Sequence, residues 1–401
     1  MPNTNPNTLL AINPPAHFAD RLLAWFDTHG RHHLPWQFHQ YDRANIYAVW
    51  LSEIMLQQTQ VATVLNYFEP FLAKFPTVQD LACADWDEVA KSWAGLGYYA
   101  RARNLHAGAK QLDDFIKTHG DFPQTLADWQ AIKGVGASTA GAIMAMGVRD
   151  FGVICDGNVK RVLTRHQAID ADITKKDTDQ AIWRLAHELT PAKNSGRYAQ
   201  AMMDLGATIC TRTKPKCDLC PVSQDCQARQ QGKQTTYPVK SKSAPKPHRH
   251  SLTIIIRHHD RTLWLKRHST DKANGIWEGL WCLPLATSSI DQSSVIATPA
   301  MLIPSLVAPQ HAQIGELQVL TLVADYLNTT DKTKLAFLTP VKHTLTHFHW
   351  HLYPVIITID EQIFTQINHT LAQVQTPFKW CEQTAHLAIP TAMQKVLNTL
   401  K

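Results

Sequence analysis

The chain has 401 residues, which at roughly 150 residues per domain suggests two or three folded domains. Hydrophobic residues make up 44% and charged residues 18% of the chain, a balance typical of globular rather than disordered proteins. With 22 prolines and 17 glycines, the composition excludes collagen-like and low-complexity proteins. The formal net charge is +6, which is only mildly basic.

The start of the chain, residues 1–15, is polar and rich in Asn and Pro, and we expect it to be disordered. It has neither the basic flank nor the apolar core of a secretory signal. No apolar run approaches the roughly 18–20 residues that a membrane helix needs. The sequence therefore predicts a cytoplasmic protein that makes no contact with a membrane.

From residue 18 to about 227, apolar residues recur at spacings of three and four. Short breaks rich in Gly and Pro separate these periodic stretches, as they do between short helices. The pattern predicts an all-α domain over residues 16–227, with about ten helices and a helical hairpin at about 125–148.

Residues 228–250 are polar and basic and contain three prolines, which is typical of an interdomain linker. The same basic strip could also follow a polyanion. After it, an alternation of period two predicts an α+β domain over residues 251–401. We expect a β-hairpin from 252–256 and 262–266, further strands near 318–325, 336–338 and 348–357, and a terminal helix from Pro390.

Four of the eight cysteines lie close together with the spacing C-x6-C-x2-C-x5-C. In a reduced intracellular chain, clustered thiols hold metal more often than they pair. The spacing favours a [4Fe–4S] cluster but leaves a tetrahedral zinc ion or unrelated structural cysteines open. Basic residues inside the loop can offset an anionic cluster and face phosphate. The four cysteines are Cys210, Cys217, Cys220 and Cys226.

This loop occurs together with four other motifs, at residues 50–60, 95–101, 134–136 and 156–160. In this combination the chain resembles the MutY-type adenine DNA glycosylases of the helix-hairpin-helix, iron–sulfur base-excision family. The resemblance extends over nearly the whole chain and is strongest over residues 34–226. It implies an all-α glycosylase domain with a [4Fe–4S] loop at 210–226, followed by a Nudix-like α+β domain at 251–401.

The resemblance also implies a function in base excision repair. The protein would hydrolyse the N-glycosidic bond of adenine mispaired with 8-oxoguanine or guanine in double-stranded DNA, acting as a monomer. The cluster would serve a structural role, because hydrolysis needs no redox step.

Two carboxylates are candidates for the chemistry. Glu53 interrupts an apolar stretch at 46–56, where a lone Glu is usually exposed or partnered. Asp156 precedes a predicted helix through His166, where simple helix capping would explain it. The resemblance assigns Glu53 as general acid and base and Asp156 as the group that stabilises a cationic sugar.

The segment around Gly134 and Gly136 joins two predicted helices by a tight turn. The start of the second helix presents free N–H groups, which suit DNA phosphate, although an ordinary helical hairpin would look similar. The family usually has Leu-Pro before the first Gly, where this chain has Ile132-Lys133. Related bifunctional glycosylases carry a nucleophilic Lys where this chain has Ser138, so we expect a monofunctional enzyme.

The remaining DNA contacts come from the resemblance. Gln58 and Tyr98 match positions that fill the stack left by an extruded base, although an exposed Gln and a core Tyr would be the ordinary interpretation. Further contacts are expected to the adenine pocket and to the phosphate and ribose. They involve Trp36 and Gln200 for the pocket, and Asn158 and Lys160 for the backbone.

The Nudix-like resemblance is carried by residues 275–284. A Nudix hydrolase needs a Glu-rich metal helix soon afterwards, but residues 285–317 contain only Glu316, so pyrophosphate hydrolysis is not expected. The family's lesion-sensing loop reads Phe-Ser-His; here it reads Leu345-Thr346-His347. Thr346 and His347 would therefore contact 8-oxoguanine, with a weaker apolar contact from the Leu.

Two other functions fit parts of the sequence. One is a pyrimidine-lesion glycosylase with lyase activity, against which Ser138 and the second domain both count. The other is a non-catalytic nucleic-acid-binding protein with a zinc loop.

Overall fold

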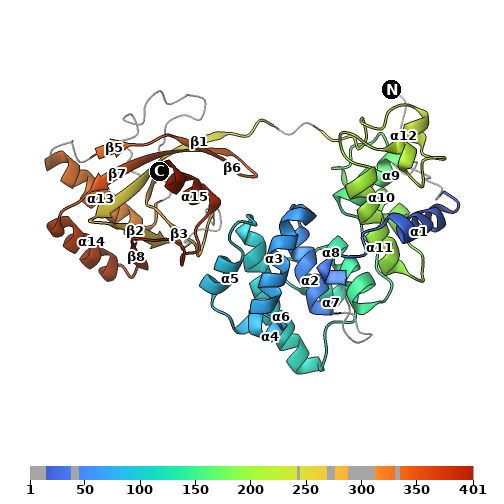
Figure 1. Cartoon of the computed structure of the whole chain (residues 1–401), viewed down its shortest axis with the longest axis horizontal. Helices are drawn as coiled ribbons and strands as arrows, with labels where there is room; N and C mark the ends of the chain where they lie inside the picture. The colour runs from blue at the N-terminus through green and yellow to red at the C-terminus, as the bar shows by residue number, and fades with distance from the viewer. Residues whose placement is uncertain are drawn as a thin grey trace. The chain divides into compact units, whose positions relative to one another are not determined.

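The computed structural model describes residues 15–37, 45–241, 244–268, 276–287, 312–329 and 335–400. These residues form two compact units (Figure 1), the first from residues 1–83 and 100–243 and the second from residues 84–99 and 244–401. Of the predicted disordered segment 1–15, residues 1–14 lie outside the described residues. None of the described helices is long and apolar enough to cross a membrane.

The first unit is helical, as the apolar spacing predicts. Short π-helical turns continue two of its helices, over Ile143–Val148 and Leu205–Ile209, and a 3-10 turn covers Pro35–Gln37. The helices are α1 (Phe18–His29), α2 (Ile46–Leu56), α3 (Val61–Lys74), α4 (Val78–Cys83), α6 (Tyr99–His119, of which Tyr99 belongs to the second unit), α7 (Leu126–Ala131), α8 (Ala137–Ala142), α9 (Gly157–His166), α10 (Lys176–Leu189), α11 (Ser195–Asp204) and α12 (Gln227–Gln230).

Local signals explain where α2 and α9 begin. The Asn45 side chain accepts a hydrogen bond from the Ala48 backbone N–H at the start of α2. Asp156 caps α9 in the same way. Both helices have the bounds that the sequence predicts, and α9 packs with α1, α10 and α11 around one apolar core. This core includes Phe18, Leu22, Leu163, Ile182, Leu185 and Met202.

The second unit contains an eight-stranded mixed sheet with the order β3-β2-β1-β7-β5. β1 pairs in parallel with β7, so His248 stands opposite His349. β4 also pairs with β1, β6 with β7, and β8 with β2. The strands are β1 (His248–His258), β2 (Arg261–Lys266), β3 (Trp281–Cys282), β4 (Leu285–Thr287), β5 (Leu335–Phe337), β6 (Val341–Thr344), β7 (His349–Thr358) and β8 (Phe378–Cys381).

Helices α13 (Ile314–Thr329) and α14 (Glu361–Gln373) pack together against this sheet (Figure 1). The predicted hairpin and the predicted terminal helix, α15 (Thr391–Leu397), are confirmed. The predicted strand near 318–325 is wrong, because these residues lie in α13. Their apolar side chains at 319, 320 and 323 are buried with the spacing of a helix face.

The segment 84–99 belongs to the second unit. It contains α5 (Trp86–Ser92), whose Trp86 donates a hydrogen bond from Nε1 to the Gly279 carbonyl at 3.0 Å. Asp87 pairs with Lys266 at 2.6 Å. No local signal in the sequence indicates this association, because the partners lie nearly 200 positions away.

The predicted linker 228–250 makes ordered contacts near both of its ends. Tyr237 is buried, and its carbonyl accepts a hydrogen bond from Arg165 Nε at 3.1 Å. Ile173 N–H donates to the Val239 carbonyl at 3.1 Å. Since β1 already begins at His248, ordered structure occupies both ends of the stretch that was predicted to be a linker.

Candidate active site

A cavity of about 780 Å³ in the first unit brings together residues from α2, α3, α8, α9 and α11. Glu53 and Asp156, more than 100 residues apart in the sequence, both line it. Its volume is in the range of roughly 300–1,000 Å³ that is usual for ligand pockets. Five other predicted site residues line the same cavity: Trp36, Gln58, Ser138, Asn158 and Gln200.

Glu53 lies on the cavity side of α2, whose other residues are mostly buried. Burial, and then the negative charge of Asp156, raise the pKa of Glu53 to about 8. At neutral pH the side chain is therefore mainly a neutral acid. It can donate a proton to a group that enters the cavity.

The Asp156 carboxylate is held by hydrogen bonds at the N-terminus of α9. Its Oδ1 accepts from the backbone N–H groups of Asn158, at 2.9 Å, and Val159, at 2.8 Å. Its Oδ2 accepts from the side-chain amide of Asn158 at 3.2 Å. Asp156 thus caps α9 and at the same time lines the cavity, and the three hydrogen bonds fix the orientation of its carboxylate.

A polar network that the sequence reasoning missed supports another wall of the cavity. Arg31 lines the cavity, and its Nη2 is 2.6 Å from Oδ1 of the buried Asp204. Gln200 Nε2 donates to the same Asp204 oxygen at 2.8 Å. Trp36 is buried nearby, with its ring edge-on to Phe68. In the sequence, the one sign of this network was Asp204, a single acidic residue among the apolar residues of α11.

The end of α2 connects the cavity to the glycine hairpin. Gln57 Nε2 donates to the Gly134 carbonyl at 3.3 Å and to Thr139 Oγ1 at 3.4 Å. Gln58 is exposed at the cavity and has a positive φ of 57°. Tyr98 lies in the second unit and does not line this cavity; it is 51% exposed and has a φ of 49°.

The hairpin has the turn that its two glycines predict. Gly134 has a φ of +85°, and a Cβ there would lie 2.8 Å from the Asn104 Cβ, so a larger residue would strain the turn. Gly136 is the N-cap of α8 and is exposed. Ser138 Oγ accepts a hydrogen bond from the Cys155 N–H at 3.0 Å, which joins the hairpin to the segment that carries Asp156.

Asn158 and Lys160 differ in their placement. Asn158 lines the cavity and also accepts a hydrogen bond from Arg161 Nη2 at 2.8 Å. Lys160 lies outside the lining and forms an ion pair with Asp179 on α10. Of this predicted pair, only Asn158 is at the cavity in the described structure.

The four clustered cysteines line one small pocket, together with Arg165, Lys216 and Arg229 among others. Arg165, which is 2% exposed, donates from Nη1 to Cys210 Sγ at 3.4 Å and to the Thr211 carbonyl at 2.7 Å. Burial, followed by the charges of the other cysteines, raises the pKa of Cys220 to about 12. Four thiolates would need a shared cation here, so the donor set fits a four-cysteine metal centre.

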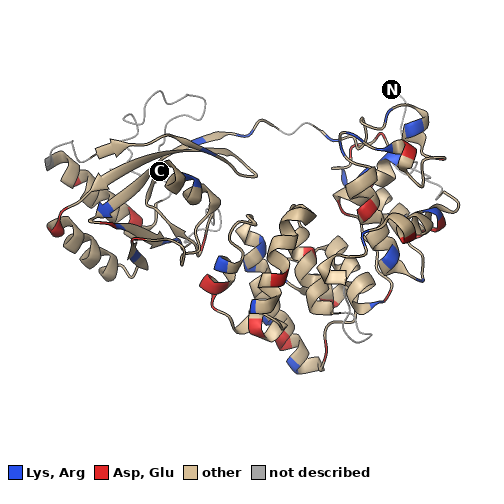
Figure 2. Cartoon of the chain, in the orientation of Figure 1, with Lys and Arg blue, Asp and Glu red and all other residues tan. Residues whose placement is uncertain are grey.

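Figure 2 shows lysines and arginines near α12. Three of them lie in the loop between the first two cysteines. Their charge can offset an anionic cluster or attract a polyanion. They are Arg212, Lys214 and Lys216.

The predicted lesion-sensing residues lie at the tip of the β6–β7 hairpin in the second unit. Thr346 and His347 are both exposed. Leu345 closes the turn by donating its N–H to the Phe348 carbonyl at 2.9 Å, and its own carbonyl accepts from Lys246 Nζ at 2.8 Å. Two hydrogen bonds to the backbone of Leu345 therefore hold the tip, while Thr346 and His347 are exposed to solvent.

The motif at 275–284 is described from residue 276 onward. Glu316 is buried and accepts hydrogen bonds from the Leu285 N–H, at 2.8 Å, and from Arg267, at 3.3 Å. These contacts give Glu316 a structural role. We predicted that no Glu-rich metal helix follows this motif. Most of that stretch, residues 288–311, lies outside the described part of the chain.

Two parts of the chain match known protein families. Residues 51–188 match the HhH-GPD superfamily of base excision DNA repair proteins, and residues 252–399 match the NUDIX domain. The matches agree with a helix-hairpin-helix glycosylase domain followed by a Nudix-like domain.

Relatives of known name are similar along most of the chain. The adenine DNA glycosylase of Buchnera aphidicola subsp. Acyrthosiphon pisum is 32% identical over 385 residues, which cover 96% of this chain and 97% of that protein. The adenine DNA glycosylase of Homo sapiens is 45% identical over 222 residues, covering 54% of this chain and 40% of that protein. Among solved structures, a thermostable thymine-DNA glycosylase has a TM-score of 0.47 and 25% identity, covering 53% of this chain and 95% of that chain.

Proposed function

The chain belongs to the adenine DNA glycosylase family, and we propose that it hydrolyses the N-glycosidic bond of adenine mispaired with 8-oxoguanine or guanine in double-stranded DNA. The observation that carries the proposal is the pairing of Glu53 and Asp156 in one cavity, with the pKa of Glu53 raised to about 8. The two carboxyl groups can then do different work at the same pH, one as an acid and the other as an anion.

Glu53 supplies the proton that lets the base leave. Adenine is a poor leaving group as an anion, so N7 must gain a proton before the bond between C1′ and N9 breaks. The neutral carboxyl group of Glu53 donates this proton. Its carboxylate then accepts a proton from the water that attacks C1′, which restores the acid for the next cycle.

Asp156 stabilises the sugar while the bond is broken. Positive charge develops on C1′ and the ring oxygen, and a fixed carboxylate lowers the energy of that state. The three hydrogen bonds from Asn158 and Val159 hold the group in place. Because it is already oriented, little reorganisation is needed when the charge appears.

The adenine reaches these groups by leaving the duplex, at a cost of roughly a few kcal/mol. Trp36 offers a ring face to the extruded purine, and Gln200 offers both a donor and an acceptor to its edge. Gln58 and Tyr98 fill the space left in the stack. Gly134, Gly136 and Ser138 would hold one phosphate, and Asn158 would lie near the ribose. Lys160 would contact the backbone only after leaving its ion pair with Asp179, outside the cavity.

The enzyme is monofunctional in this proposal. Ser138 is engaged by the Cys155 N–H and has no amine with which to form an imine with the sugar. Strand cleavage by a covalent lyase route is therefore not expected. Borohydride treatment during turnover should trap no protein–DNA adduct, and a stable adduct would contradict this part of the proposal.

Cys210, Cys217, Cys220 and Cys226 would hold a [4Fe–4S] cluster. The cluster would cross-link the loop that carries Arg212, Lys214 and Lys216, whose positive charges suit the DNA backbone, and no step of the hydrolysis depends on it. Purified protein should be brown, with about four iron atoms per chain. If the purified protein is colourless and contains one zinc ion per chain, the four cysteines bind zinc and not an iron–sulfur cluster.

Thr346 and His347 at the exposed tip of the β6–β7 hairpin would contact 8-oxoguanine on the opposite strand. Their hydroxyl and imidazole groups can hydrogen-bond to the oxidised edge. Leu345 provides an apolar contact beside them.

The decisive experiment is single-turnover base release from four matched duplexes. They carry A opposite 8-oxoguanine, A opposite G, A opposite T, and T opposite G. We expect fast adenine release from the first, slower release from the second, and little from the last two. Release of thymine from T opposite G without release of adenine would overturn the proposal.

A further inference from the structure

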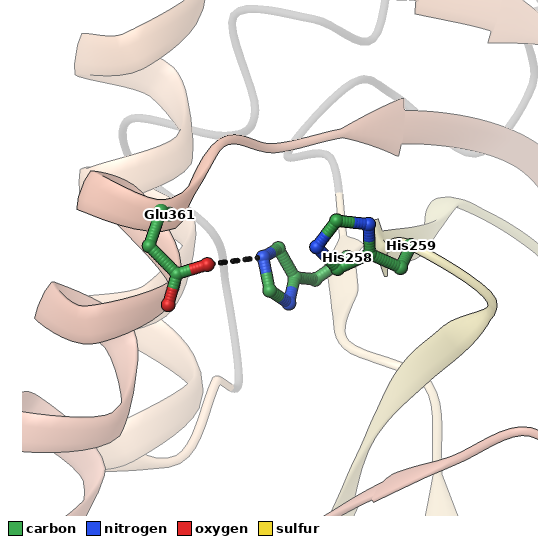
Figure 3. Close-up of side chains that lie close together, drawn as sticks. All are labelled: His258, His259 and Glu361. Atoms are coloured by element: carbon green, nitrogen blue, oxygen red, sulfur yellow. Dashed lines mark ion pairs between the residues drawn. The ribbon is translucent and has the colours of Figure 1, made fainter.

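Two histidines and a glutamate converge in the second unit, outside the cavity and the hairpin tip. His258 is the last residue of β1, His259 follows it in the turn to β2, and Glu361 is the first residue of α14 (Figure 3). One ligand atom from each lies within 4.8 Å of the other two. His258 Nε2 is 3.0 Å from a Glu361 oxygen.

Packing fixes the direction in which His258 points. Its side chain is 4% exposed, and its ring stacks on Phe364 with centroids 4.0 Å apart. Trp380 meets the same ring edge-on at 6.3 Å. Nδ1 is enclosed without a hydrogen-bond partner among the described residues, so Nε2 is the nitrogen that this ring can offer to a ligand.

His259 and Glu361 are exposed and complete the group. His259 has a φ of 53°, an uncommon conformation for a non-glycine residue. Its ring lies at an angle of 61° to His258, with centroids 4.3 Å apart. Glu361 is not needed to cap α14, because Asp360 accepts the hydrogen bond from the Ile363 N–H.

The two elements that carry the ligands are held together by their backbones. The Ile359 N–H donates to the Arg257 carbonyl at 2.9 Å. Arg257 directly precedes His258, and Ile359 lies two residues before Glu361. A cation bound here would therefore meet ligands that are already close together. Binding would need only small side-chain movements, which limits its entropic cost.

We propose that His258, His259 and Glu361 form a binding site for a divalent transition-metal ion, with Zn²⁺ as the test ion. Two imidazoles and one carboxylate are ligands that such ions accept, and the exposed side of the group leaves positions for water. An ordinary His258–Glu361 ion pair would not need His259, yet a His259 nitrogen lies within 4.8 Å of the ligand atoms of both other residues. The ion would clamp the β1–β2 turn to α14 and take no part in base release.

Charged residues near the three ligands affect how strongly a cation would bind. The Arg261 guanidinium lies over the Phe364 ring at 5.5 Å, and it opposes cation binding. Asp260 lies in the same turn and contributes the opposite charge. Because Glu361 is 75% exposed, we expect weaker binding than at the four-cysteine site.

The test is equilibrium dialysis of the full-length, cluster-loaded protein against Zn²⁺, with zinc and iron measured in the same samples. The variants are His259→Ala and Glu361→Gln, both at exposed positions that are not expected to affect folding. The matched control is His369→Ala, an exposed histidine on the same helix. It controls for adventitious binding in a chain with 21 histidines.

We expect each of the two variants to bind one equivalent of zinc less than the wild type, while His369→Ala binds as much as the wild type. Constant iron content would show that zinc has not displaced iron at the cysteines. Zinc should also raise the melting temperature of the wild type by more than that of either variant. Equal zinc binding by the wild type and both variants would overturn the proposal, whatever the result for adenine release.

Discussion

The cavity that holds Glu53 and the hairpin tip that holds Thr346 are built in different ways. The cavity takes residues from five helices, α2, α3, α8, α9 and α11, and its polar groups are tied into caps, ion pairs and buried walls. The tip presents two consecutive exposed residues on one turn, supported by two hydrogen bonds to its backbone. Changes in the cavity should therefore alter both chemistry and stability, whereas changes at the tip should alter only the choice of substrate.

The largest effect is expected for Glu53→Gln. Loss of the acid should slow single-turnover adenine release by about 10³-fold while leaving mispair binding intact. Because the fold no longer has to bury an ionisable carboxyl group, the variant should also melt at a higher temperature than the wild type at pH 8. The matched control is Glu69→Gln, at an exposed position on α3, which should change neither property. Undiminished release by Glu53→Gln would refute the assigned role.

Asp156 allows catalysis and capping to be separated, because Asn is also a good helix cap. Asp156→Asn should keep the acceptor for the Asn158 and Val159 N–H groups and lose the charge. We expect a fall in adenine release of about 10²-fold. Asp156→Ala should slow release similarly and also lower the free energy of unfolding by about 1 kcal/mol. Thermal melts beside rate measurements test this, and an Asn variant with wild-type activity would contradict the electrostatic role.

The raised pKa of Glu53 predicts a pH profile with a definite sign. The acid is protonated below its pKa of about 8, so the second-order rate of adenine release by the free enzyme should fall above this pH, approaching tenfold per unit. The folded state binds this proton more tightly than the unfolded state, so the carboxyl group also reduces stability as pH rises from about 4.5 to about 8. DNA binding measured over the same pH range separates the loss of the acid from the loss of stability, because only an unfolded protein would stop binding. A rate that stays flat to pH 10 would mean that another group is the acid.

The sequence predicted the parts of this site that depend on local signals. The apolar run after Asn45 predicted α2, and Asp156 as a cap predicted the start of α9. The cysteine spacing predicted that four cysteines share one site, and all four line one pocket. The pairing of Glu53 and Asp156 in one cavity was predicted from the family resemblance. The spacing of apolar residues could not have predicted it.

Features that depend on distant partners were not predictable. Arg31 and Asp204 pair across 173 positions, and neither belongs to a recognisable motif. The association of segment 84–99 with the second unit depends on contacts such as Trp86 with Gly279. The error at α13 had another cause, because a short apolar run fits a strand or a helix until its packing partners are known.

At the tip, Thr346→Ala combined with His347→Ala should act on preference alone. Removing two hydrogen-bonding groups should reduce the ratio of release rates for 8-oxoguanine and guanine partners by about tenfold. Release from the guanine mispair and the melting temperature should not change, because both side chains are exposed. His369→Ala, exposed elsewhere in the same unit, is the control. An unchanged ratio would remove the tip from the account of lesion recognition.

The smallest effect is expected for Leu345→Phe, which restores the aromatic residue of the Phe-Ser-His pattern. An aromatic ring can stack on a base face and adds about 0.5–1.5 kcal/mol of contact, so the preference for 8-oxoguanine should rise by roughly three- to tenfold. Leu345 contributes its backbone N–H and carbonyl to the turn, and the substitution leaves both in place. A matched Leu345→Ala variant should move the preference in the opposite direction. If Phe and Ala give the same ratio, the side chain at 345 does not touch the lesion, and recognition depends on polar groups alone.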